Sequence, residues 1–597
     1  MCMSKEGAFY PEFLSTRYIP ALIRCTAPRS HYSTTHDNPG RVKEKGKEKG
    51  EGEEAVGKGK ERAKRRGKQK ESNQVWNNAE IPQSESQRRT VYALSTPLGK
   101  AGVAVVRISG PDALQAWSGM TRPATRRADP TSDRQREPTP WRMERRDIVH
   151  PTTKDKLDDG LVVFFKAPSS FTTEDVLELH IHSGRAVISS VLSALAHIPG
   201  CRPAEPGEFT RRAFEGGRLD LTQVEGLKDL INAETELQRR MALQNAGGAA
   251  KQEFDELRSD ILECLVLLEA IVDFSEEFHE GDEEKLFQDT QELARGLCDR
   301  ISDHLNNPRG EILRSGIRLA IFGPPNVGKS SLLNYLAKRE ASIVTDVPGT
   351  TRDVVELSLD LGGLPVIVAD TAGLRKADDL VENIGIGRAQ DTVKGSNISL
   401  CVLSLPDALV QTPEGPRIQI PPSVAPLITP STYFLLNKMD MVKSPPDMSG
   451  VQAAVEGTRV VGGNSGEDGE GKGEEVGALG NRAWAVSLRT GDGMGTFLEG
   501  FTEVLRERYD FSQDQDGSTV PLITHARHRH HLQTAIDHLH AFTSFLHPST
   551  PRTAESKYVD IAAEEVRQAA KAIGKVTGAI DNEDVLDQLF RDFCIGK

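Results

Sequence analysis

The residues Gly323 to Ser330 follow the pattern Gly-x-x-x-x-Gly-Lys-Ser, whose residue types and spacing suit the binding of a polyphosphate. They lie between two apolar segments, 317–322 and 332–337, which predicts a strand, a loop and a helix in that order. Backbone N–H groups of such a loop surround phosphates at a helix N-terminus. We expect Lys329 to neutralise the β- and γ-phosphates and Ser330 to offer its hydroxyl to Mg²⁺. The nucleotide contacts expected from this segment are Asn326, Val327, Gly328, Lys329, Ser330 and Ser331.

Two further motifs suit the γ-phosphate and its metal ion. The segment Gly349–Asp353 reads Gly-Thr-Thr-Arg-Asp and supplies Thr351 to Mg²⁺ and the γ-phosphate. A second motif, Asp-Thr-Ala-Gly, follows an apolar strand-like run. We expect Asp370 to hold the metal through water and the Gly373 N–H to contact the γ-phosphate. The nucleotide contacts expected from this motif are Asp370, Thr371, Ala372 and Gly373.

Two later motifs predict the identity of the base. Asn437, Lys438 and Asp440 end the apolar run 433–436, and the Asp440 carboxylate can accept both N–H groups on the Watson–Crick edge of guanine. Adenine presents an acceptor at one of those points, so a buried charge would be left unpaired. The segment 486–489 contains Ser487 and fits a loop that closes over the base. Five motifs in this order, each at a strand end, predict a GTPase domain.

One position departs from the Ras-like pattern. The residue after Gly373 is Leu374, where Ras-like enzymes carry a glutamine that orients water. Asn326 is a candidate ligand for a monovalent cation that stands in for an arginine finger. Glu382 could orient the water, and a solvated switch carboxylate is the competing interpretation.

Length and composition restrict the classes of protein to which this chain can belong. A chain of 597 residues predicts three or four domains. The net charge of −13 argues against a broad nucleic-acid-binding surface but leaves room for a local basic patch. The seven cysteines are widely spaced, which favours a reducing compartment over a disulfide framework or a zinc site. No apolar run approaches about 18 residues, so the sequence predicts no membrane span.

Composition and periodicity divide the chain into five parts. Residues 15–35 carry three arginines, several hydroxyls and no acid, which indicates a mitochondrial presequence, with a disordered tail as the alternative. The predicted architecture is multidomain α/β plus all-α, with a Ras-like P-loop GTPase inserted in a helical domain. The expected parts are presequence and charged linker 1–88, an α/β domain 89–205, a first helical half 206–315, the GTPase 316–515 with a disordered insertion 450–480, and a second helical half 516–597.

Three polar clusters lie outside the GTPase motifs. Strict alternation over 176–182 places Glu178, His180 and His182 on one strand face, as a wall for a polar ligand or a solvated surface; a metal site is less favoured. The histidine-rich segment 525–531 also contains arginines, which favours a solvated or helix-facing cluster over a metal site. Cys594, fourth from the end, suits covalent or redox chemistry, or an inert packed thiol.

Together these motifs resemble the tRNA-modification GTPases of the MnmE/TrmE family in a mitochondrial form. The resemblance covers roughly residues 90–597 and rests on the GTPase motifs and five further segments. The five segments are Gly102–Gly110, Thr173–Leu179, Pro206–Thr210, Arg218–Gln223 and the terminal Phe593–Lys597. One departure is His182-Ser183-Gly184, where the family often has His-Gly-Gly.

The resemblance implies a tetrahydrofolate one-carbon carrier, 5,10-methylenetetrahydrofolate or 5-formyltetrahydrofolate, bound by an N-terminal dimerisation domain. Carried over by motif, its contacts are Arg107, Glu178, Arg218 and Lys597. It also implies potassium at Asn326 and at backbone oxygens of Thr345, Val347 and Thr350, next to the nucleotide contact Asp346. Glu382 would then position water, and Cys594 would serve modification rather than GTP turnover.

The reaction implied is modification of the tRNA wobble uridine at C5 in the mitochondrial matrix. It requires a homodimer and a flavin-dependent partner of the MnmG/GidA type, while GTP hydrolysis drives domain movement. Two alternatives stay open from the sequence. One is a GTPase switch for ribosome assembly, and the other is a folate-dependent methyltransferase with a vestigial GTPase.

Overall fold

The computed structural model divides the chain into two compact units, Met1–Arg218 with Asp587–Lys597, and Leu219–Leu586. The presequence and linker expected at 1–88 lie outside the described residues. Among the described helices, none is both long and apolar enough to cross a membrane. The structure describes residues 89–124, 137–274, 279, 282–339, 357–368, 390–413, 415–443, 452–455, 475–478, 482–509, 521–544, 555–579, 589–591 and 593–596.

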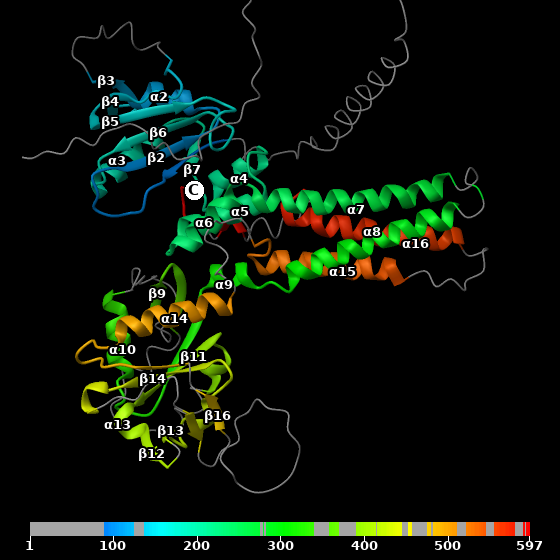
Figure 1. Cartoon of the computed structure of the whole chain (residues 1–597). Coiled ribbons are helices and arrows are strands. Elements are labelled where there is room, and N and C mark those ends of the chain that lie inside the picture. The colour runs from blue at the N-terminus through cyan, green and yellow to red at the C-terminus, as the bar shows by residue number, and fades with distance from the viewer. Residues whose placement is uncertain are drawn as a thin grey trace, which may run out of the picture. The chain divides into compact units, whose positions relative to one another are not determined.

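The first unit contains a seven-stranded sheet (Figure 1). Its strands are β1 Thr90–Leu94, β2 Ala104–Ser109, β3 Thr121–Pro123, β4 Glu144–Val149, β5 Lys156–Phe165, β6 Val176–Ile181 and β7 Cys201–Pro203. The spatial order is β3-β4-β5-β6-β2-β1-β7. Helices α2 (Ala113–Met120) and α3 (Arg185–Leu195) pack on the apolar face. In β6 the alternate residues Leu177, Leu179 and Ile181 are buried in this core, as the period of two predicts.

The opposite face of this sheet carries α4 (Glu208–Glu215) and the C-terminal tail. Phe209 of α4 packs on Val91 and Ala93 of β1. Ile595 forms a bridge with Pro206, and the Ser95 hydroxyl donates to the Gly596 carbonyl at 2.9 Å. Gly596 has φ of 96°, and a Cβ there would clash with the Leu94 carbonyl. The tail therefore packs with the N-terminal unit, which differs from its predicted place in the helical half 516–597.

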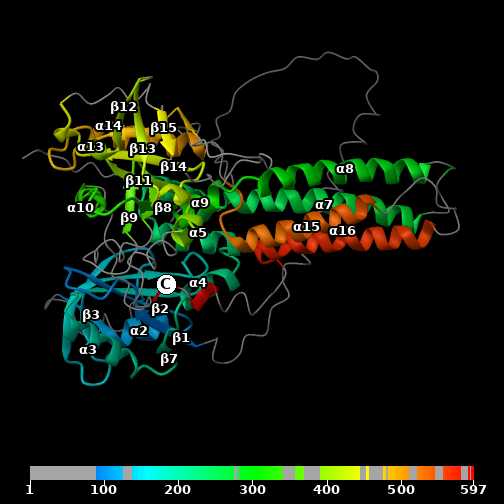
Figure 2. The same cartoon turned by 90° about the horizontal axis from the view of Figure 1, so that it is seen from below.

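The second unit combines a helical bundle with an α/β sheet. The core of the bundle contains residues from 250–301 and from 522–576. In the sequence, the first segment precedes the strands of the sheet and the second follows them. Figure 2 shows α7, α8, α15 and α16 side by side. On α7 the buried residues Leu257, Ile261, Leu265 and Leu268 recur at helical spacing. The helices are α5 Leu221–Asn232, α6 Glu236–Ala246, α7 Ala249–Asp273, α8 Asp282–Leu305, α9 Arg309–Ser315, α15 Ala526–Ser544 and α16 Glu555–Thr577.

The sheet of the second unit has six strands. They are β8 Ile317–Phe322, β9 Leu357–Leu361, β10 Leu364–Val368, β11 Ile398–Ser404, β14 Thr432–Asn437 and β17 Ala483–Ala485. The order is β17-β14-β11-β8-β10-β9, parallel except for the hairpin β9–β10. The helices that accompany it are α10 Lys329–Arg339, α13 Leu405–Ala408, η2 Ala425–Leu427, η3 Met439–Met441 and α14 Met494–Arg508. Loops at the carboxyl ends of such parallel strands are where α/β proteins bind ligands.

A smaller four-stranded sheet corrects one expectation. Its strands are β12 Leu409–Thr412, β13 Gly415–Ile420, β15 Gln452–Val455 and β16 Glu475–Ala478, in that spatial order. The predicted disorder of 450–480 therefore does not hold at the two ends of that segment. The segment was predicted to be disordered because it is rich in Gly and Glu, yet it contains two short strands, Gln-Ala-Ala-Val and Glu-Val-Gly-Ala. These strands pair with each other, and the first also pairs with β13.

Candidate functional site

The loop between β8 and α10 has the backbone of a phosphate-binding loop. Gly323 and Gly328 have φ of 150° and 108°, and Asn326 has φ of 60°. A Cβ at Gly323 would clash with the Val402 carbonyl, and one at Gly328 with the Asn437 amide. Glycine is therefore required at both positions for sterics as well as for conformation.

Lys329 already faces the interior of this loop. Its ammonium donates to the carbonyls of Gly323 and Pro324, at 2.9 and 2.6 Å. Burial lowers the pKa of this amine. A partly desolvated cation beside exposed backbone N–H groups fits the β- and γ-phosphates of a nucleotide.

The residues predicted to recognise the base meet the phosphate loop through Asn437, at the end of β14. The Asn437 side chain donates to the Val327 carbonyl at 2.8 Å and accepts from the Leu488 N–H at 3.0 Å. The Ser487 hydroxyl donates to Asp440 Oδ1 at 2.8 Å. Asn437 thus ties the phosphate loop to the loop after β17, and Ser487 orients the carboxylate that would read guanine. Lys438, which follows Asn437 in the sequence, has a left-handed backbone with φ of 68°.

The structure brings together part of the predicted nucleotide site. Residues 326–331 lie with Asn437, Lys438, Asp440 and Ser487 at the carboxyl ends of β8 and β14. The remaining predicted residues lie outside the described part of the chain: Thr345, Asp346, Val347, Thr350, Thr351, Asp370, Thr371, Ala372, Gly373, Glu382 and Lys597.

A second polar site lies on the α4-covered face of the first sheet. Arg107 of β2 and Glu178 of β6 are register partners, and Arg107 Nε donates to Glu178 Oε1 at 2.8 Å. The Phe171 and Phe209 rings flank the guanidinium, with centroids 5.3 and 5.7 Å from Cζ. Burial alone would raise the pKa of Glu178, but His180 and Arg107 hold it below its ordinary value. The carboxylate is therefore ionised at neutral pH.

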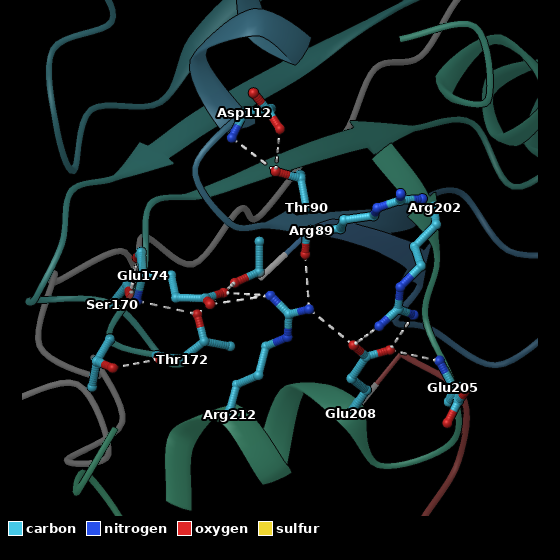
Figure 3. A network of polar contacts seen from close by, with 12 residues as sticks. Arg89, Thr90, Asp112, Ser170, Thr172, Glu174, Arg202, Glu205, Glu208 and Arg212 are labelled. Carbon is cyan, nitrogen blue, oxygen red and sulfur yellow. Dashed lines mark hydrogen bonds and ion pairs between the residues drawn. The ribbon is translucent and has the colours of Figure 1, made fainter. Parts of the chain in front are cut away.

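A buried ion-pair network supports this site (Figure 3). Arg212 of α4 lies between Glu174 and Glu208, at 3.0 and 2.9 Å, and Arg202 contacts Glu208 at 2.6 Å. Although burial would raise the pKa of Glu208, these arginines keep it low. The network fixes α4, which carries Phe209, to the loop that carries Phe171. The sequence motifs around these residues did not predict the network. The available signal was the pair of opposite charges four residues apart, Glu208 and Arg212, on either side of Phe209.

Two other predicted contacts lie in the same unit. Arg218 donates from Nη1 to the Ser170 carbonyl at 2.8 Å, in the loop just before Phe171. Cys594 has an exposed thiol in the anchored tail. Among the described cysteines it alone is exposed; burial raises the pKa of Cys264 and of Cys298 to about 11. Cys594 is therefore the described cysteine best placed for chemistry.

In the histidine-rich segment, His528 is buried and pairs with Glu225 of α5, and the flanking His525 and Arg527 are partly buried. His528 Nε2 lies 2.7 Å from Glu225 Oε2, and Arg527 donates to both oxygens of the same carboxylate. Glu225, His525 and His528 have the spacing of metal ligands. Arg527 pairs with Glu225 and Arg314 with the adjacent Asp229, so the carboxylates are already neutralised. The helix-facing interpretation fits this arrangement better than a metal site.

Comparison with known proteins gives consistent matches over both units. Residues 90–218 match the family model described as GTP-binding protein TrmE N-terminus, and residues 221–594 match the MnmE helical domain. A Parvibaculum lavamentivorans protein named tRNA modification GTPase MnmE is 40% identical over 512 residues, 85% of this chain and 100% of the relative. A Rhodospirillum rubrum protein of the same name is 40% identical over 85% of this chain and 99% of the relative. The Danio rerio protein named 5-taurinomethyluridine-[tRNA] synthase subunit GTPB3, mitochondrial, is 39% identical over 85% of this chain and 93% of the relative.

Proposed function

Because the chain belongs to the MnmE family of tRNA modification GTPases, we propose that it is the GTP-hydrolysing component that modifies C5 of the wobble uridine in mitochondrial tRNAs. The group installed is of the carboxymethylaminomethyl or taurinomethyl type, and one carbon comes from a tetrahydrofolate. The observation that carries the proposal is the presence of two sites in one chain. Asp440 and the phosphate loop form one, and the Arg107–Glu178 pair forms the other.

The nucleotide half of the function uses GTP, Mg²⁺ and K⁺. Lys329 and the loop N–H groups hold the phosphates, and Asp440 selects guanine. Ser330, Thr351 and Asp370 would hold Mg²⁺, and Asn326 would hold K⁺ with the backbone of Thr345, Val347 and Thr350. Both ions would supply positive charge beside the phosphates. Glu382 orients the attacking water in place of the missing glutamine. This GTPase is inserted in a helical domain, and its cycle moves the helices.

The modification half uses the polar site of the first unit. Arg107, Glu178 and Arg218 hold a reduced folate together with Lys597, and the carrier supplies a one-carbon unit when bound. The residues present fit such a ligand, because an arginine flanked by two phenylalanine rings lies beside an ionised carboxylate. Cys594 acts in the modification step. A flavin-dependent protein of the MnmG/GidA type is the partner, and two copies of this chain associate through their N-terminal domains.

Nucleoside mass spectrometry of mitochondrial tRNA tests this function. A strain that lacks the protein is compared with the same strain carrying the wild-type chain. We expect the modified wobble uridine to disappear in the deletion and to return with the wild-type chain. An unchanged nucleoside profile in the deletion, with GTP hydrolysis intact in the purified protein, would contradict the proposed role.

Replacing potassium by sodium is expected to slow GTP hydrolysis on the order of tenfold, because a cation held by Asn326 takes over part of the charge stabilisation of an arginine finger. The measurement is the initial rate in matched chloride salts at constant ionic strength. Asn326→Ala should lower the rate in potassium to the rate in sodium. Equal rates of the wild-type protein in both salts would remove the cation from the mechanism.

Cys594→Ser is expected to abolish tRNA modification while GTP hydrolysis persists. Cys594 precedes Ile595 and Gly596, which anchor the tail to Pro206 and Ser95 of the first unit. A hydroxyl keeps the shape of the tail but lacks the nucleophilicity of a thiolate. The variant is introduced into the deletion strain and its tRNA nucleosides are quantified. Full restoration of the modified uridine would show that the thiol takes no part.

A further inference from the structure

One imidazole on the Arg107–Glu178 face has a buried nitrogen whose polar contact, among the described residues, is a long one to a carboxylate. His180 lies two residues after Glu178 on β6, so both side chains project from the same face. Its Nε2 is buried and makes no hydrogen bond to any described residue. The nearest acceptor, Glu178 Oε2, is 3.7 Å away, beyond hydrogen-bond range.

The residues directly opposite His180 on the neighbouring strands do not supply a partner. The residues opposite His180 are Val105 on β2 and Leu161 on β5, and both are apolar. A buried polar nitrogen without a partner is unfavourable, and native proteins keep few such atoms outside functional sites. This nitrogen can therefore still form one hydrogen bond, to a ligand beside Glu178 in the polar site.

The geometry around His180 defines the chemistry of a ligand. Glu178 uses Oε1 for Arg107, so Oε2 and the His180 Nε2 form a polar pair 3.7 Å apart. Leu161, which is 42% exposed, provides apolar surface on the neighbouring strand. A flat nitrogen heterocycle with neighbouring ring and exocyclic polar atoms can bond both groups along one edge while its face covers apolar side chains.

We propose that His180 is a further ligand-binding residue of this site and hydrogen-bonds the nitrogen heterocycle of the reduced folate beside Glu178. The proposal rests on the folate-binding part of the proposed function. It assigns recognition of the ring edge to Glu178 and His180 together. Arg107 then positions the carboxylate as well as contributing charge.

The test is the affinity of the full-length protein for 5-formyltetrahydrofolate, measured by titration calorimetry. His180→Leu is expected to weaken binding about tenfold, since one hydrogen bond to a buried group is lost. His180→Gln keeps an amide in reach of the same position and should stay within about threefold of the wild type. The matched control is His197→Leu, since His197 is exposed, follows α3 on the other face of the sheet and contacts the Ser193 carbonyl at 2.9 Å, and its affinity should not change.

The outcomes separate this inference from the function on which it rests. If the wild-type protein fails to bind the folate, the folate part of the proposed function is wrong and the inference falls with it. If the wild type binds and His180→Leu binds equally well, the role of His180 alone is refuted. Circular dichroism and thermal unfolding report whether each variant is folded, because His180 and the GTPase motifs lie in different compact units. Should His180→Leu not fold, His180→Asn replaces it, because its shorter amide cannot reach the ligand; wild-type affinity in that variant would equally refute the role.

Discussion

Asp440→Asn is expected to weaken GTP binding about 100-fold or more and to create binding of xanthosine triphosphate, because a carboxamide complements a carbonyl where guanine offers an amino group. The Asp440 carboxylate accepts one hydrogen bond from Ser487, through Oδ1. Asn437 holds the surrounding loops in place through Val327 and Leu488. The substitution therefore changes the reading of the base and leaves the frame of the site intact.

Competition titrations with a fluorescent guanine nucleotide measure this change. Asp492→Asn is the matched control, since Asp492 lies in the loop after β17 that carries Ser487, is exposed and accepts from Thr490 at 2.6 Å. The control should bind GTP like the wild type. Unaltered preference for GTP over xanthosine triphosphate in Asp440→Asn would show that another residue reads the base.

Glu225→Gln is expected to destabilise the second unit by about 3–5 kcal/mol, the usual effect of removing one member of a buried ion pair. Glu225 is 3% exposed and accepts from Arg527 and from His528. Arg527 also donates to the carbonyls of Lys575 and Val576, which links α5 and α15 to the end of α16. Loss of the carboxylate charge leaves the Arg527 guanidinium, whose side chain is only 15% exposed, without this counter-charge.

Thermal unfolding compares this variant with Glu269→Gln. Glu269 pairs with Arg567 between α7 and α16, but both side chains are about half exposed, so about 0–1 kcal/mol is expected. A large fall in the midpoint temperature of unfolding is expected only for Glu225→Gln. Equal midpoints for the two variants would show that the buried cluster contributes no more than a surface pair.

The same cluster has a defined pH dependence. Burial would raise the pKa of Glu225, but His528 and Arg527 hold it well below its ordinary value of 4.5. A carboxyl whose folded pKa is depressed stabilises the fold above its unfolded pKa and loses that contribution as the pH falls through the folded pKa. The stabilisation by Glu225 is therefore complete at neutral pH and is lost only in strong acid. His525, whose pKa burial lowers to about 3, stays neutral at neutral and mildly acidic pH and is protonated only in the same strongly acidic range.

The sequence by itself determined the phosphate loop and the polar face of β6. Residues 323–330 are contiguous, so glycine spacing and the flanking apolar runs specify the strand, loop and helix locally. The alternation at 176–181 likewise predicted that Glu178 and His180 share a face, because a period of two is a property of the strand alone.

Only the tertiary structure decided which distant residues meet. Glu225 and His528 are 303 positions apart, and Ser95 and Gly596 are 501 apart. No local pattern encodes such pairs, because they depend on how whole elements pack and on which charges that packing removes from water. For the same reason His528, in a histidine-rich run that could be solvated, is a buried partner of Glu225. A tail that was predicted to lie with the helices packs against the end of β1.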